Sequence, residues 1–314
     1  MNFPLWFSFM LFGVLESLVG LILNTFIVVF NLKVLRIGNE VNPSALLHFL
    51  MGVTNILLLT LIFPQVMIIV VFRHVFFYQG VQEFFLIPVT VLMYFQYWLN
   101  AWLCLFYCTS VTTFSHRFIV WSKRNIPRFL PYLLSISAVL SLATGVLFTP
   151  DGISQPQPSG NVTLDFALPG YTYSTLHMML FTFLCCWPPF IISLLSAGFT
   201  ASFLLEHIWN MKQGVLGFTR PQMKTYVNAV RTMTSLILLS ASYYLVVIWC
   251  AAIPFKLDDL HLVNGLFGVS YPTIEVAIII QSNSKLRKIL QSWCSSTCRK
   301  MRNEVRLGWV GRSR

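Results

Sequence analysis

Seven long apolar runs constrain this chain more than any other feature of its sequence. A helix that crosses the hydrocarbon core of a bilayer needs roughly 20 mainly apolar residues, and each run is close to that length or longer. The runs cover residues 9–30, 44–72, 84–106, 131–149, 176–205, 232–254 and 262–281. The second and fifth exceed one crossing, so we expect them to tilt or to project beyond the bilayer. The pattern predicts an all-α membrane protein, a bundle of seven transmembrane helices.

Composition agrees with this interpretation and excludes other classes. The 314 residues are 56% hydrophobic and only 10% charged, whereas soluble domains carry about a quarter charged residues. The mean hydropathy is +0.72. Such values exclude a disordered chain, a nucleic-acid-binding domain and most soluble enzymes. Because few other long stretches remain, we expect a single membrane domain over residues 1–314, with a cytoplasmic tail at 282–314 and no cleavable signal peptide.

The distribution of Lys and Arg predicts the orientation. If the N-terminus lies outside, the inner loops and the tail hold 19 of the 21 basic residues, and only Arg73 and Lys256 lie outside. Cytoplasmic segments of membrane proteins carry this excess of positive charge. The sequence therefore predicts an outer N-terminus and an inner C-terminus, in a multi-pass protein of the plasma membrane. The same topology explains the net charge of +11 without a nucleic-acid partner.

Signals for catalysis and for cofactors are absent from the sequence. There is no P-loop, nucleophile elbow, zinc-protease motif or dinucleotide-binding fingerprint, and the six histidines are scattered. We therefore expect neither an enzyme nor a metal site nor a cofactor. No cysteine lies in a predicted outer loop, so no extracellular disulfide is expected. Asn161 begins a glycosylation sequon in the second outer loop, and Cys294 and Cys298 in the tail are either palmitoylated or plain thiols.

Seven spans with basic inner loops form the layout of G-protein-coupled receptors. The largest family of these receptors ends its third helix with an acidic-Arg-Tyr triplet and has Asn-Pro-x-x-Tyr in its seventh. Here the third span ends Thr112-Thr113-Phe114-Ser115-His116, and the seventh runs Tyr271-Pro272-Thr273-Ile274-Glu275. Both motifs are missing, so the rhodopsin-like assignment fails.

A different set of motifs occurs in five segments of the chain. They are Glu16-x-x-x-Gly20-x-x-x-Asn24 with Asn31; Trp98, Phe106-Tyr107 and Trp121-x-Lys123-Arg124; Pro189-Phe190-x-x-Ser193 and His207-x-x-x-Met211; Pro221, Ala229 and Arg231; and Tyr271-Pro272 with Asn283-x-Lys285-Leu286. In this order the chain resembles, over essentially its whole length, the bitter taste receptor (taste receptor type 2) family. The resemblance implies a chemosensory receptor for small organic compounds, with a small-molecule agonist and a heterotrimeric G protein of the gustducin/inhibitory type as its partners.

The chain departs from the family pattern at several helix positions. Where the family has Arg in the second helix and Lys in the third, this chain has Asn55 and Ser110. Where the family has Asp and His in the third inner loop, it has Arg220 and Tyr226. In the seventh helix, Glu275 and Val276 stand in place of a His-Ser pair. These departures suggest a distant branch, so the similar type-1 vomeronasal receptors stay open as an alternative. A small transporter or channel is the alternative from a different class, although a transporter should show an internal repeat and none is visible.

An aromatic face in the third span is the first candidate for a ligand site. Phe95, Trp98, Leu99 and Trp102 recur at helical spacing and share one face. Such a face is either an aromatic pocket wall or ordinary packing against the core or lipid. The resemblance favours a ligand contact at Trp98 and at Tyr243, and it places Gly265 and Gly268 where they leave room for a ligand. Asn100 either contacts the ligand or bonds a neighbouring helix.

Buried polar residues form a second candidate set, for helix packing or switching: Asn24, Asn55, Pro272, Glu275 and Asn283. A carboxyl group deep in the bilayer is costly, so we expect Glu275 to be protonated or paired with Asn24, Asn31 or Asn55.

The third set of candidate residues consists of expected G-protein contacts on the inner surface. Its members are basic or flank the inner ends of the helices: Arg117, Lys123, Arg124, His207, Met211, Lys212, Lys224 and Arg231. After Asn283, Leu286, Ile289, Leu290 and Trp293 alternate with basic residues, which predicts a short amphipathic helix lying on membrane lipid.

Overall fold

The computed structural model describes residues 3–38, 42–72, 79–111, 117–147, 186–212, 220–252, 257–293 and 295–296. Within these ranges the chain forms seven long α-helices. They are α1 (Phe3–Ile37), α2 (Pro43–Val71), α4 (Gln79–Val111), α5 (Arg117–Leu147), α7 (Trp187–Lys212), α8 (Arg220–Ala252) and α9 (Leu257–Ser282). All seven contain a segment long and apolar enough to cross a membrane. The predicted all-α bundle of seven spans is therefore confirmed.

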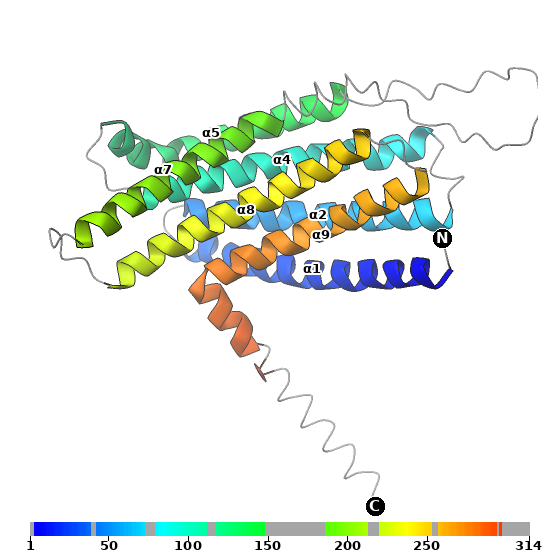
Figure 1. The fold of residues 1–314 in the computed structure, drawn as a ribbon, viewed down its shortest axis with the longest axis horizontal. Coiled ribbons are helices and arrows are strands. Elements are labelled where there is room, and N and C mark those ends of the chain that lie inside the picture. The colour runs from blue at the N-terminus through cyan, green and yellow to red at the C-terminus, as the bar shows by residue number, and fades with distance from the viewer. Residues whose placement is uncertain are drawn as a thin grey trace, which may run out of the picture.

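The helices lie side by side, and the start of α1 and the end of α9 lie at opposite ends of the bundle (Figure 1). Helix α4 is the central element, because it packs against α2, α5, α7 and α8. Helix α9 packs against α1, α2 and α8, which closes the bundle around α4.

Several helices extend beyond the apolar runs that predicted them. Helix α5 begins at Arg117, well before the apolar run at 131, and α8 begins at Arg220 rather than at 232. Arg and Lys are good helix formers, so a helix continues past the hydrocarbon core where its side chains become charged. The end of the fourth run (148–149), the start of the fifth (176–185) and the end of the sixth (253–254) lie outside the described residues.

The start of α2 shows how the local sequence sets a helix boundary. Asn42 has an extended backbone, and its side-chain oxygen accepts hydrogen bonds from the backbone N–H groups of Ser44 (3.1 Å) and Ala45 (3.4 Å). Asn is a favoured N-cap, and Pro43 stands at the first helical position, where a missing N–H costs nothing. The helix therefore begins one residue before the apolar run.

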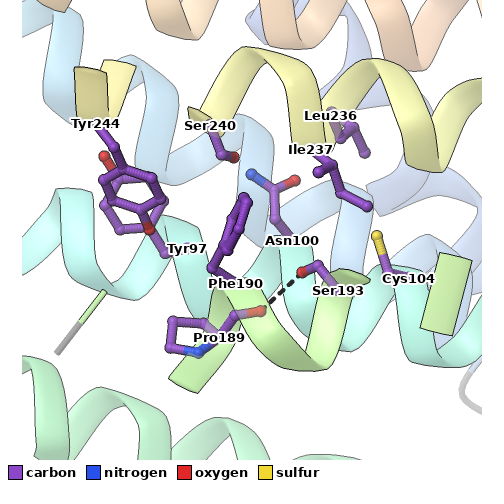
Figure 2. A pocket seen from close by; sticks show the side chains of 10 residues that line it. All are labelled: Tyr97, Asn100, Cys104, Pro189, Phe190, Ser193, Leu236, Ile237, Ser240 and Tyr244. Atoms are coloured by element: carbon purple, nitrogen blue, oxygen red, sulfur yellow. Dashed lines mark hydrogen bonds between the residues drawn. The ribbon is translucent and has the colours of Figure 1, made fainter. Parts of the chain in front are cut away.

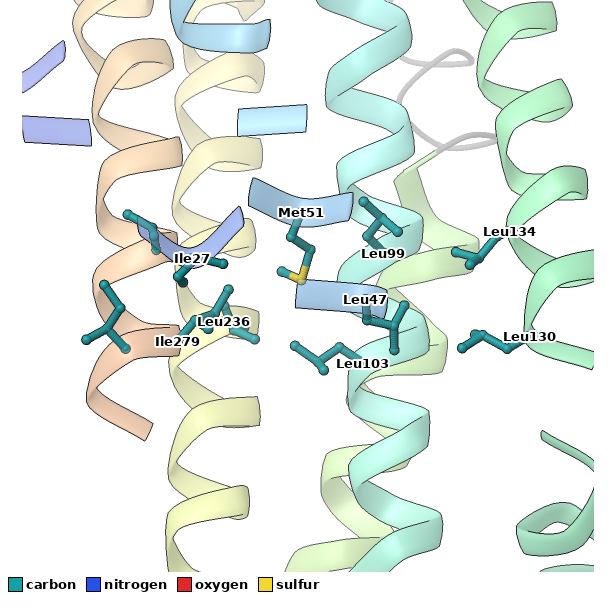
Figure 3. Packing of buried hydrophobic residues seen from close by; sticks show 11 residues of the cluster. Ile27, Leu47, Met51, Leu99, Leu103, Leu130, Leu134, Leu236 and Ile279 are labelled. Atoms are coloured by element: carbon teal, nitrogen blue, oxygen red, sulfur yellow. The ribbon is translucent and has the colours of Figure 1, made fainter. Parts of the chain in front are cut away.

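The apolar core crosses the bundle from α1 and α9 through α2 and α4 to α5 (Figure 3). Leu47 and Met51 of α2 pack beside Leu99 and Leu103 of α4, and all four are fully buried. In a bilayer such packing contributes van der Waals contact rather than a large hydrophobic gain. The outward faces also carry large apolar side chains, for example Val139, which is 64% exposed, as expected of a surface that faces lipid.

Small residues let α1 approach its neighbours. A Cβ atom on Gly20 would lie 2.9 Å from Leu59 Cδ1 of α2 and closer still to Thr273 Oγ1 of α9. Such distances are shorter than real Cβ contacts, so a larger side chain at this position would force Thr273 or Leu59 to shift. Small residues at helix interfaces are the usual basis of close helix packing in membranes.

A short helix over 284–293 follows α9 and turns away from the bundle axis (Figure 1). The side-chain oxygen of Asn283 accepts hydrogen bonds from the backbone N–H groups of Lys285 (3.1 Å) and Leu286 (3.3 Å), so Asn283 is the N-cap of this helix. Leu286 is fully buried against the bundle, whereas Ile289 and Trp293 are exposed. The predicted amphipathic helix is present; its contact with lipid stays a prediction.

Candidate functional site

A buried carboxyl group lies at the centre of the bundle. Glu275 of α9 is fully buried and accepts hydrogen bonds from three side-chain amides. Asn55 of α2 donates to Oε2 at 2.8 Å, and Asn100 of α4 donates to Oε1 at 2.6 Å. Gln96, one turn before Asn100 on α4, also donates to Oε2. The amides supply the hydrogen bonds that a buried carboxyl group needs when no water surrounds it.

The Tyr271 hydroxyl extends this cluster towards α8. It accepts a hydrogen bond from Asn100 (3.0 Å), donates to Glu275 Oε1 (3.4 Å) and lies 3.5 Å from the Ser240 hydroxyl. The cluster therefore joins four helices, α2, α4, α8 and α9, through side chains that are all buried.

Of the three asparagines predicted as partners for Glu275, the structure selects Asn55. Asn55 contacts the carboxyl group, whereas Asn31 donates to the backbone oxygen of Ile27 in its own helix (2.9 Å). Asn24 donates to Gly20 O (2.8 Å) and to Pro272 O of α9 (3.5 Å), so it links α1 to α9 instead. Gln96 was missed, although its spacing of four from Asn100 places both amides on one face of the helix.

A small cavity lies beside the polar cluster, between α4, α7 and α8 (Figure 2). Its lining mixes aromatic, aliphatic and uncharged polar side chains. The lining residues are Tyr97, Asn100, Cys104, Pro189, Phe190, Ser193, Leu236, Ile237, Ser240 and Tyr244. Ligand sites in proteins have this character, a mostly apolar wall with a few polar groups.

Asn100 and Ser240 belong both to the cavity wall and to the polar cluster. Aromatic rings surround the same region: the centroid of the Tyr97 ring lies 4.8 Å from that of Tyr244 and 6.4 Å from that of Tyr243. The cavity and the buried carboxyl group are therefore neighbours, separated by the Asn100 side chain.

The two tryptophans of α4 face a different neighbour. The rings of Trp98 and Trp102 stack with their centroids 5.7 Å apart and their planes at 22°, and Trp102 Nε1 donates to Ser137 Oγ of α5 at 2.9 Å. Consecutive helical residues point about 100° apart, so Trp98 diverges from Tyr97. Neither tryptophan lines the cavity, and their role in ligand binding stays a prediction.

The remaining predicted ligand residues divide between two interfaces. The centroid of the Tyr243 ring lies 5.6 Å from that of Tyr271, so Tyr243 borders the polar cluster. Gly265 and Gly268 face α2: a Cβ on the first would lie 2.5 Å from Val66 Cγ2, and a Cβ on the second 3.5 Å from Ile62 Cγ2. The structure thus groups Asn100 with Tyr243 and separates both from the tryptophans and the glycines.

The predicted inner contacts lie in the first turns of α5 and α8 and the last turns of α7, with Arg231 about three turns into α8. Among them the structure describes the side chain of Arg231 only, and it is exposed. The side chains of Arg117, Lys123, Arg124, His207, Met211, Lys212 and Lys224 lie outside the described residues, as do Asn161, Cys294 and Cys298.

The seven membrane-crossing helices define a multi-pass membrane protein with the architecture of a receptor, and the described lining of the cavity between α4, α7 and α8 has no charged side chain. A family model described as "Taste receptor protein (TAS2R)" matches residues 1–297. The chain therefore belongs to the taste receptor type 2 family. It is a chemosensory, bitter-taste-type G-protein-coupled receptor of the plasma membrane and not an enzyme, and its partners are small-molecule ligands and a heterotrimeric G protein.

Individual relatives agree with the family match. Taste receptor type 2 member 40 of Gallus gallus is 26% identical over 299 residues, which cover 89% of this chain and 92% of the relative. Taste receptor type 2 member 4 of Gorilla gorilla gorilla is 27% identical over 241 residues, 76% of this chain and 79% of the relative. Taste receptor type 2 member 119 of Mus musculus is 25% identical over 295 residues, 89% of this chain and 82% of the relative. These matches place the chain in this family rather than among the vomeronasal receptors, transporters or channels.

Proposed function

We propose that small, partly apolar organic agonists bind in the cavity between α4, α7 and α8, and that the agonist-bound receptor activates a G protein of the gustducin/inhibitory type. The position of Asn100 carries this proposal. Its side chain lines the cavity and donates to both Glu275 and Tyr271. An agonist that engages Asn100 therefore acts on the group that holds α4 to α9.

The proposal needs an agonist that favours one conformer over another, because a ligand shifts an equilibrium only by its differential affinity. The enclosed space of the cavity is about 10 Å³, measured as the room for the centre of a water-sized sphere, which is space for about one water molecule and too little for a drug-sized ligand. We therefore expect agonists to bind best to a conformer in which α7 or α8 moves outwards from α4.

The inner ends of α5, α7 and α8 are the proposed G-protein surface. With an outer N-terminus, these ends and their basic residues face the cytoplasm, as the distribution of Lys and Arg predicts. The short helix after Asn283 carries Lys285, Arg287 and Lys288, which are suited to anionic lipid headgroups.

Reconstitution tests the coupling. Agonists are first found by screening bitter compounds on cells that express the receptor with a promiscuous G-protein chimera. The purified receptor is then mixed with gustducin, with an inhibitory-type or with a stimulatory-type heterotrimer, and GTP exchange is measured. Exchange evoked by agonist on the first two alone supports the proposal, whereas preferential exchange on the stimulatory type contradicts it.

The proposed orientation has its own test. An N-terminal epitope should bind antibody on intact cells, and a C-terminal epitope only after permeabilisation. Labelling of the C-terminal epitope on intact cells would contradict an inner C-terminus.

A further inference from the structure

We infer that the cavity selects neutral ligands that carry both a hydrogen-bond donor and a hydrogen-bond acceptor, the class that includes primary and secondary carboxamides and lactams. This inference rests on the proposed function, because it takes the cavity as the agonist site.

Two buried polar atoms of the cavity wall carry the inference. The Tyr97 hydroxyl has no hydrogen-bond partner within the described part of the chain, although the residue is only 4% exposed. Asn100 is equally buried, and its Oδ1 also lacks a partner, because only its Nδ2 bonds to Tyr271 and Glu275. Buried polar groups in folded proteins are nearly always paired, so each of these two atoms requires an explanation.

The two atoms have complementary requirements. A tyrosine hydroxyl offers a donor and an amide oxygen accepts. A ligand that satisfies both must therefore present an acceptor to Tyr97 and a donor to Asn100. A carboxamide carries these two groups on one planar unit.

Other polar groups of the cavity wall already have partners. The Ser193 hydroxyl donates to Pro189 O of its own helix at 2.8 Å, and Tyr244 donates to Cys186 O at 3.4 Å. Ser240 lies 3.5 Å from the Tyr271 hydroxyl. Among the described lining residues, Tyr97 and Asn100 are therefore the ones with a side-chain oxygen that has no hydrogen-bond partner.

The charge of the wall excludes ionised ligands. Among the lining residues that the structure describes, there is no Asp, Glu, Lys, Arg or His. An ion that entered would lose its hydration without gaining a partner of opposite charge. Glu275 lies behind the Asn100 side chain and is not among the lining residues, so it offers an ion in the cavity no direct contact.

The aromatic side chains define the body of the ligand. The Phe190 and Tyr244 rings meet edge to face with their centroids 5.9 Å apart, and Tyr97 lies against Tyr244. Such rings favour a flat or aromatic ligand body. The smallest compound with all these features is benzamide, which we take as the probe.

The experiment measures probe binding to the purified full-length receptor in lipid nanodiscs by ligand-observed NMR. Benzamide should bind about tenfold or more tightly than N,N-dimethylbenzamide, which has lost the N–H donor, since one net hydrogen bond of about 1.4 kcal/mol is a factor of ten. Benzoate and benzylammonium should bind more weakly than benzamide.

Tyr97→Phe is the deciding variant, because it removes the hydroxyl and keeps the ring in its aromatic cluster. It should weaken benzamide binding by about tenfold. Tyr132→Phe is the matched control: it removes the same hydroxyl from a tyrosine of α5 that is 68% exposed and lies away from the cavity, and it should leave benzamide affinity unchanged.

The inference is overturned if benzamide does not bind, if it binds no better than its dimethyl analogue or the charged probes, or if Tyr97→Phe leaves its affinity unchanged. These failures are distinguishable from failure of the proposed site. If Phe190→Ala weakens the response to a screened agonist, the cavity stands as the agonist site and only the ligand class is wrong.

Discussion

The two sides of the bundle are held together by different means. On the side of α1, α2 and α9, glycines bring the helices close, and side chains bond across the interfaces. Gly20 lies against both α2 and α9, Ser270 donates to Glu16 Oε2 at 2.9 Å, and Asn24 donates to Pro272 O. On the side of α7 and α8, the hydroxyls of Ser193, Ser196 and Thr200 bond the backbone of their own helix, and Tyr244 of α8 donates to Cys186 O, just before α7, at 3.4 Å.

This difference indicates which side can change shape. Hydrogen bonds within one helix survive when the helix moves, whereas bonds and glycine contacts between helices do not. The cavity lies on the side of α7 and α8. We therefore expect the α1–α2–α9 side to act as the fixed frame and α7 and α8 to move when a ligand binds.

The largest effect is expected from filling the glycine contact of the frame. Gly20→Leu would place atoms inside Leu59 and Thr273, and overpacking of this kind costs about 1–3 kcal/mol or more. Surface expression, measured by antibody binding to an N-terminal epitope, should fall steeply. Gly198→Leu is the control, because a Cβ at Gly198 of α7 meets nothing within 4 Å, and it should express normally. Equal expression of the two variants would contradict the difference in packing between the α1–α2–α9 side and the α7–α8 side.

A smaller effect is expected from opening the cavity wall. Phe190→Ala removes an aromatic side chain that lines the cavity. Buried aromatic anchors often contribute about 2 kcal/mol at binding sites. The half-maximal agonist concentration should therefore rise by about tenfold or more, since 1.4 kcal/mol is a factor of ten.

The control for Phe190 lies on the same helix. Phe199 is 67% exposed on the outer face of α7, so Phe199→Ala removes an equal side chain away from the cavity. Agonist potency should be unchanged in this variant, with surface expression measured for both. An identical loss of potency would show that α7 responds as a whole and that the cavity is not the site.

A third effect is expected at the cluster that joins the two sides. Tyr271→Phe removes the hydroxyl that contacts Asn100, Glu275 and Ser240. Losing a buried partner costs about 1–3 kcal/mol, so the melting temperature of the purified receptor should fall. Tyr132→Phe, at a residue that is 68% exposed, should leave it unchanged. A melting temperature unaffected by Tyr271→Phe would mean that the cluster does not hold α8 to α9.

The smallest effect is expected at the tryptophan pair. Trp102→Phe keeps an aromatic ring but loses the hydrogen bond to Ser137 of α5, and such bonds between membrane helices average about 0.6 kcal/mol. The melting temperature of the purified receptor should fall slightly. Trp209→Phe is the control, because Trp209 is 67% exposed, and it should leave the melting temperature unchanged. If the pair only packs α4 against α5, agonist potency stays the same; a large loss of potency would instead place the agonist site at Trp98 and Trp102.

Much of the architecture could be predicted because it depends on composition along the chain. A bilayer requires long apolar segments, so the seven spans are visible as seven runs. The helix after Asn283 was likewise predictable, because a capping residue and a helical spacing of apolar residues are local patterns. Helix ends were harder to predict. Helices α5 and α8 include charged segments before their apolar runs, so a prediction from hydropathy makes these helices too short.

The site was harder to predict, because it depends on how each helix is rotated. Trp98 and Tyr97 are neighbours in sequence, yet the first stacks on Trp102 and the second lines the cavity. Both faces of α4 are aromatic, so periodicity alone does not say which face meets α5 and which meets α7. In a bilayer the outside is apolar as well, and the usual contrast between core and surface is lost.

The sequence by itself determined the number of spans, the expected orientation, the absence of familiar catalytic motifs and the need for a partner for Glu275. Each of these follows from the chemistry of single segments in an apolar solvent. Only the tertiary structure decided that the partners are Asn55, Gln96 and Asn100, and that Asn100 also lines a cavity. Those contacts join residues that are up to 220 positions apart. They are set by the packing of whole helices, which no local pattern encodes.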